Sequence, residues 1–146
     1  MKKDTTQDFK KRNLFIVVLL SIVTFGIYIG YWFLSTKPAF QFVKEKNEIP
    51  FKWWVVATIY LSLSLVISVI SEFILSLYGL YVLDSIDLIC AYLFIALLYY
   101  SIFRIKEVLE DADSEIEFNS YLLFFFHIWY IQYKLNKHSS RGLQNG

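Results

Sequence analysis

Cysteine, proline and glycine are all scarce in this chain. Its 146 residues include one cysteine, two prolines and five glycines. A single thiol forms no internal disulfide and offers no paired ligands for a structural zinc ion. Cys90 lies within an apolar run, as is typical of a small buried hydrophobic residue. The sequence also lacks a nucleophile–base pair, a glycine-rich phosphate loop and an HExxH motif. We therefore expect a non-catalytic protein that uses no cofactor and no metal.

The chain also lacks a large net charge. Fourteen Lys and Arg residues nearly balance thirteen Asp and Glu residues, for a formal net charge of +1. This balance predicts no general attraction to nucleic acid. Hydrophobic residues, in contrast, make up 57% of the chain, whereas soluble domains contain about 45–50%. The additional apolar surface has to be covered by lipid or by partner proteins.

Four hydrophobic segments dominate the sequence. The first, Leu14 to Leu34, contains no charged residue, and three basic residues, Lys10 to Arg12, stand just before it. A helix of about 20 apolar residues is long enough to cross the hydrocarbon core of a bilayer. We therefore predict an all-α fold, a membrane helical bundle. The segments in chain order are residues 14–34, 53–72, 86–103 and 121–135.

These segments are expected to form one domain, because the chain is short. The membrane domain covers residues 14–135, with an interfacial loop at 35–52 and an acidic amphipathic loop at 104–119. A polar basic head, residues 1–13, precedes this domain, and a polar tail, residues 136–146, follows it. The tail is expected to be disordered.

The distribution of Lys and Arg predicts the topology. Residues 79–87 contain neither, whereas the head contains five and the loop at 35–52 contains four. Because cytoplasmic loops are enriched in Lys and Arg, we place residues 79–87 outside the cytoplasm in a bacterial inner membrane. A bend at Gly79 and a turn at Asp84–Asp87 would then connect the second and third segments as a spanning hairpin.

Two arrangements are open for the first and fourth segments. If the first segment spans the membrane, the basic head lies outside, as an exception to the charge rule. If the segment instead enters and returns at the cytoplasmic face, its helix has to break at Thr24–Gly26, at about half the membrane depth. The same choice applies to residues 121–135, which are few for a span.

Two short stretches resemble a known family. Residues 24–32 read TFGIYIGYW, and residues 130–136 read YIQYKLN. Both are similar to stretches of the domain of unknown function 4234 family, which consists of small multi-pass bacterial membrane proteins. The resemblance implies a location and a type of fold but no activity. The positions that carry it are Thr24, Gly26, Ile27, Tyr28, Tyr31, Trp32, Tyr130, Gln132, Tyr133 and Asn136.

Two further patterns are candidates for helix packing and for a polar membrane site. Gly26 and Gly30 form a small-xxx-small motif, which favours close pairing of helices in lipid, although glycine is common in membrane helices in any case. Glu72 interrupts a long apolar run and, by helix length, falls at the outer interface. The candidate polar residues on one helix face are Ser64, Ser68, Ser71 and Glu72.

The expected role is that of a non-catalytic binding or accessory component of the membrane. The lipid bilayer and its anionic headgroups are the expected partners, and a homo-oligomer or another membrane subunit are further candidates. One alternative is self-protection against a membrane-active peptide, which would suit the small size, basic ends and aromatic-rich body. A second alternative is a small channel or carrier subunit that uses the polar face around Glu72.

Overall fold

The computed structural model describes residues 11–40, 49–112 and 116–142. This part of the chain contains five α-helices and one short 3-10 helix, with no strand among its residues. The all-α prediction is therefore confirmed. In chain order the elements are α1 (Leu14–Val23), α2 (Ile27–Thr36), η1 (Lys37–Phe40), α3 (Phe51–Ile74), α4 (Leu77–Ala112) and α5 (Ser120–Gly142).

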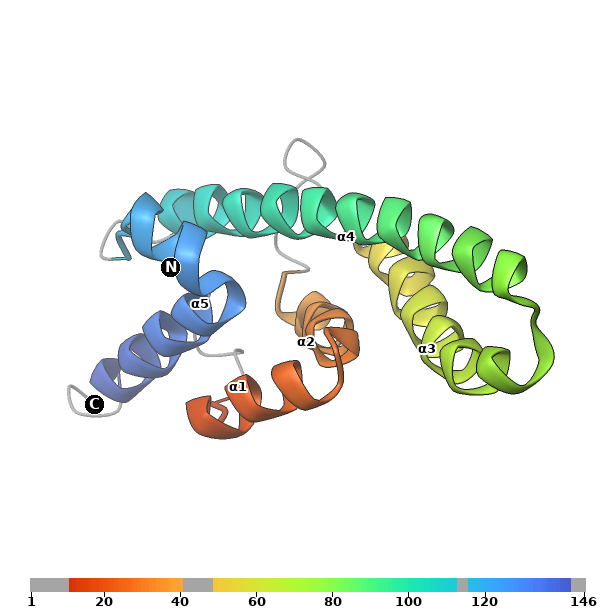
Figure 1. The fold of residues 1–146 in the computed structure, drawn as a ribbon. Coiled ribbons are helices and arrows are strands. Elements are labelled where there is room, and N and C mark those ends of the chain that lie inside the picture. The colour runs from red at the N-terminus through yellow and green to blue at the C-terminus, as the bar shows by residue number, and fades with distance from the viewer. Residues whose placement is uncertain (1–10, 41–48, 113–115, 143–146) are drawn as a thin grey trace.

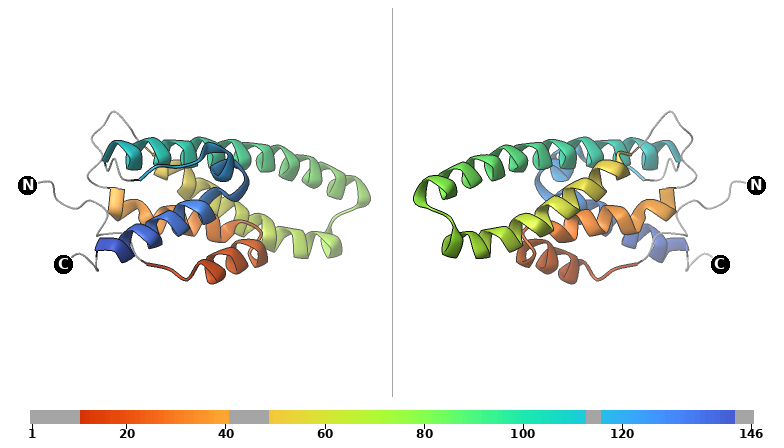
Figure 2. Two further views of the ribbon diagram at one scale, coloured as in Figure 1. Left: turned by 90° about the vertical axis from the view of Figure 1, so that its left-hand side faces the viewer. Right: turned by 90° about the vertical axis from the view of Figure 1, so that its right-hand side faces the viewer.

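The longest helix, α4, extends along the whole molecule and organises the other elements (Figure 1). Helix α3 lies beside the first half of α4, and the two form a hairpin. Helices α1, α2 and α5 gather along the second half of α4. Figure 2 shows the hairpin tip at one end of the molecule and the ends of α2, α4 and α5 at the opposite end.

The first hydrophobic segment is divided into two short helices. Phe25 and Gly26 have φ angles of 49° and 90°, a left-handed conformation that glycine adopts without steric cost. The Thr24 hydroxyl stabilises the break from both sides: it donates to Leu20 O (2.7 Å) and accepts from the Tyr28 N–H (2.9 Å). Each resulting helix has 10 residues and is therefore about 15 Å long, half the thickness of a hydrocarbon core.

The fourth hydrophobic segment is also interrupted. His127 has φ 43° and ψ −126° within α5, which ends the regular helix there. Tyr99 of α4 holds this kink, because its hydroxyl donates to Phe124 O (3.1 Å) and contacts His127 Nε2 (3.0 Å). In Figure 2 the α1–α2 turn and the α5 kink both face the hairpin tip and stop well short of it.

The predicted position of the hairpin turn is wrong. Gly79 and residues 84–87 lie inside α4, and the chain turns at Leu75 and Ser76 instead. The Ser76 hydroxyl accepts a hydrogen bond from the Gly79 N–H (3.4 Å), which is the pattern of a helix N-cap. The Ser85 hydroxyl donates a hydrogen bond to Tyr81 O (2.8 Å), one turn earlier in α4. Ser85 therefore lies within the helix and does not begin it.

Two predicted boundaries, at the C-terminal ends of α4 and α5, also need correction. Residues 104–112 are the last turns of α4 and not a separate acidic loop, because Ile105, Val108 and Leu109 continue its buried face. The predicted disordered tail begins as helix, since α5 ends only at Gly142. Residues 1–10 of the basic head, residues 41–48 of the loop at 35–52, residues 113–115 and the last four residues lie outside the described residues.

Aromatic side chains join α2, α3 and α4. Trp54 is fully buried, stacks on Phe33 with 4.0 Å between ring centroids, and meets the edge of Phe94 at 5.6 Å. Its indole N–H donates to Ser101 Oγ (2.9 Å). This cluster fixes the α3–α4 hairpin to α2.

Gly30 lets α2 approach α3 closely. A Cβ atom at this position would overlap Thr58 Oγ1. Gly26 lies in the break, so the two glycines share no face of one continuous helix. The predicted pairing motif is therefore divided, and Gly30 serves packing within one chain.

We expect Gly30→Ala to destabilise the protein by about 1–3 kcal/mol, because α2 has to move away from Thr58. The measurement is unfolding in mixed detergent micelles, followed by circular dichroism. Gly79→Ala is the matched control and is expected to change the stability far less, because a Cβ at Gly79 would lie 3.3 Å from Leu75 Cβ, whereas a Cβ at Gly30 would overlap Thr58 Oγ1. Equal losses for the two variants would contradict this packing role. Adding Thr58→Ala to Gly30→Ala should restore part of the stability.

Candidate functional site

Helices α3 and α4 are long and apolar enough to cross a membrane. Within their most apolar windows only 11% and 17% of the residues are buried, which differs from the core helix of a soluble protein. Among the described residues, exposed large apolar side chains outnumber buried ones. Apolar side chains near the α1–α2 turn and the α5 kink are exposed as well: Phe25 is 78% exposed, and Phe125 is 68% exposed.

The two stretches that carry the family resemblance meet in space. The indole N–H of Trp32 donates to Gln132 Oε1 (2.8 Å), and Gln132 Nε2 donates to Asn136 Oδ1 (2.9 Å). Asn136 in turn binds the backbone of Arg12, donating to its carbonyl (2.6 Å) and accepting from its N–H (3.2 Å). The Arg12 guanidinium donates to Ser35 Oγ (2.7 Å). This Trp32–Asn136 network ties α5, the end of α2 and the residues before α1 together.

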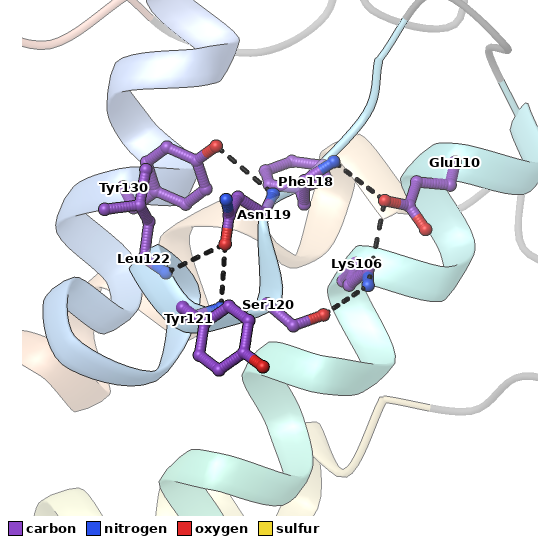
Figure 3. A network of polar contacts seen from close by, with 8 residues as sticks. All are labelled: Lys106, Glu110, Phe118, Asn119, Ser120, Tyr121, Leu122 and Tyr130. Carbon is purple, nitrogen blue, oxygen red and sulfur yellow. Dashed lines mark hydrogen bonds and ion pairs between the residues drawn. The ribbon is translucent and has the colours of Figure 1, made fainter.

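Tyr130, a further residue of the resemblance, belongs to a second network at the start of α5 (Figure 3). Its hydroxyl accepts the Asn119 N–H (3.3 Å). The Phe118 N–H donates to Glu110 Oε1 (2.8 Å), and this carboxylate lies 4.0 Å from Lys106 Nζ. These contacts anchor α5 to the end of α4, so this network is structural.

The remaining residues of the resemblance have packing or surface positions. Ile27 and Tyr28 are half-buried, and the ring of Tyr28 lies 5.7 Å from that of Tyr31. Tyr31 is exposed and lies 6.0 Å from the Arg12 guanidinium carbon. Tyr133 is exposed as well.

The predicted polar face on α3 does not form one site. Ser71 is buried and donates to Ser68 O (3.0 Å), whereas Ser68 and Glu72 are exposed. Of the four predicted residues, only Ser64 has a described polar contact with another helix, a hydrogen bond to Asp87 of α4.

A polar centre that sequence reasoning missed lies between α3 and α4. The Asp87 carboxylate accepts two hydrogen bonds at Oδ1, from the Tyr60 hydroxyl (2.5 Å) and the Ser64 hydroxyl (2.9 Å). The sequence predicts a turn at Asp84–Asp87. In the structure, Asp87 lies instead within helix α4, inside the apolar hairpin. We call Asp87, Tyr60 and Ser64 the Asp87 centre.

The Asp87 centre borders an apolar cavity of about 670 Å³ between α3 and α4. Tyr60, whose hydroxyl bonds to Asp87, and Cys90, three residues after Asp87 on α4, line the cavity, whereas Asp87 itself does not. The cavity extends from there toward Pro50 and Tyr100, at the end of the hairpin opposite to the tip. Its other lining residues are Trp53, Val56, Ala57, Leu61, Leu93, Phe94, Ala96 and Leu97.

The described residues hold no group of three or more His, Cys, Asp or Glu side chains that could bind a metal ion. No family model matches the chain, and neither a curated protein nor a solved structure is similar to it. The resemblance to the domain of unknown function 4234 family therefore stays a prediction.

Proposed function

We propose that this protein is a non-catalytic integral membrane component in which the α3–α4 hairpin crosses the bilayer. The observation that carries the proposal is the low burial of two long apolar helices. Their exposed leucine, isoleucine, valine and aromatic side chains would need lipid or partner proteins around them, because a soluble monomer rarely exposes such large apolar surfaces.

The proposal includes half-inserted first and fourth segments. Two features support it: α1 and α2 are each too short to span, and α5 is kinked at His127. Irregular backbone at membrane depth needs hydrogen-bond partners for its polar groups, and Thr24 and Tyr99 supply such partners at the two breaks. The basic residues at the ends of these segments, such as Lys37 and Lys137, then share the cytoplasmic face, in line with the charge rule.

Cysteine labelling in cells tests this topology. In a Cys90→Ser background, we expect Ser76→Cys to react with a membrane-impermeant maleimide added outside. Lys37→Cys, Asp111→Cys and Lys137→Cys should react only after permeabilisation. These three positions are exposed in the structure. If they do not react in intact cells, the reason is that the membrane separates them from the maleimide, and not that the protein buries them.

Two other outcomes would change the proposal. Outside labelling of Lys37→Cys alone would mean that the first segment spans. A protein that stays monodisperse without detergent and fails to float with liposomes would contradict the membrane role itself.

A further inference from the structure

The Asp87 centre has no counter-charge within the described residues. Their ion pairs, Arg104–Glu107 and Lys106–Glu110, lie near the end of α4 that is remote from the tip. Both described hydrogen bonds to Asp87 go to Oδ1, which leaves Oδ2 as the acceptor without a described donor. A carboxylate in a lipid environment is costly unless it is paired.

The cavity beside this carboxylate has the size and chemistry of a ligand site. Its volume of about 670 Å³ lies within the range of about 300–1,000 Å³ that is usual for small-molecule pockets. Its walls are aliphatic and aromatic, and Tyr60 connects them directly to Asp87. Trp53 and Leu93 line it and are 66% and 65% exposed, so it opens sideways, toward lipid in the proposed arrangement.

We propose that this cavity binds a lipophilic ammonium ion. The apolar body of the ligand fills the cavity, and its charged nitrogen donates a hydrogen bond to the Tyr60 hydroxyl oxygen, whose own proton is directed at the Asp87 carboxylate. The aromatic ring of Tyr60, which lines the cavity and bonds to Asp87 through its hydroxyl, favours a cation over a neutral group. This inference rests on the proposed membrane function, and it adds the class of ligand and the residue that selects it.

Protection of Cys90 from alkylation tests the inference, because Cys90 lines the cavity and is the only cysteine. The full chain in phosphatidylcholine nanodiscs is treated with N-ethylmaleimide, and the alkylation rate is read by mass spectrometry. Imipramine, a tricyclic tertiary amine, is compared with iminodibenzyl, which keeps the rings and lacks the amine. We expect imipramine to slow alkylation and iminodibenzyl to be at least about tenfold less potent, the factor for one lost charge-assisted hydrogen bond.

Variants then locate the charge. Asp87→Asn should raise the half-protective imipramine concentration by about tenfold or more, with each variant compared with its own rate without ligand. Asp84→Asn and Glu72→Gln, acidic residues of the same hairpin that have no described bond to a residue of the cavity wall, should leave it unchanged. If Asp87→Asn does not fold in nanodiscs, the comparison of imipramine with iminodibenzyl on the wild-type protein still tests whether the ligand needs a charged nitrogen.

Three results would overturn the inference. These are equal potency of the two compounds, unchanged protection in Asp87→Asn, and protection that depends on protein concentration alone, which would assign the cavity to a second copy. Flotation of the same preparation with lipid separates the two proposals. If the protein floats but imipramine gives no protection, only the ligand inference fails.

Discussion

Replacing Trp54 with alanine is expected to destabilise the protein by about 3–5 kcal/mol, the cost of emptying a large aromatic site in a packed interior. The side chain is fully buried and contacts Phe33 of α2 and Phe94 of α4. Between helices in lipid, such packing contacts take the place of the hydrophobic effect. The loss should therefore separate the hairpin from α2. Unfolding in mixed micelles of dodecyl sulfate, followed by circular dichroism, measures it.

The neighbouring residue supplies the control for this variant. Trp53 has the same side chain but is 66% exposed, so Trp53→Ala should change the free energy of unfolding by less than about 1 kcal/mol. Trp54→Phe should fall between the two, because it keeps a stacked ring but removes the hydrogen bond to Ser101. Equal losses for Trp53→Ala and Trp54→Ala would contradict the packing described above.

Gln132→Leu is expected to cost about 2–4 kcal/mol. The side chain is 2% exposed and both accepts from Trp32 and donates to Asn136. Leucine would leave the fully buried Trp32 N–H without this acceptor, which costs about 1–3 kcal/mol, and would remove the bond to Asn136, which is worth about 1 kcal/mol. The readout is the same unfolding transition, with exposed Tyr133→Leu as the control on α5.

A double-mutant cycle with Trp32→Phe isolates the direct contact. Phenylalanine has no N–H to leave unpaired, so the double variant should lose less stability than the sum of the two single variants. We expect a coupling energy of about 1–2 kcal/mol. Additive losses would show that Gln132 acts through its other contacts and not through the indole.

Local sequence signals anticipated where the first segment breaks. Gly26 tolerates a left-handed backbone, and Thr24 bonds to its own neighbourhood, so both effects can be read within a few residues. The contact between Trp32 and Gln132 joins positions 100 residues apart. The resemblance includes Trp32 in one stretch and Gln132 in the other, but no local pattern in the sequence predicts that the two stretches are in contact.

The hairpin shows why other predictions failed. The sequence predicts a turn at Asp84–Asp87, because Asp84 can cap a following helix and Asp87 suits the positive end of that helix. The structure satisfies Asp87 from α3 instead, through Tyr60 and Ser64. A partner on another helix can thus cancel the local preference of a polar side chain, and only the tertiary structure identifies that partner.

The outline of the molecule has a consequence of its own. Helices α1, α2 and α5 widen one end, and only α3 and α4 reach the other (Figure 2). Placed in a bilayer as proposed, such a cone displaces more lipid from the cytoplasmic leaflet than from the outer one. Mismatched inclusions deform the surrounding lipid at a cost. Copies of this protein should therefore collect where the membrane bulges toward the cytoplasm, since the inner leaflet is already stretched there.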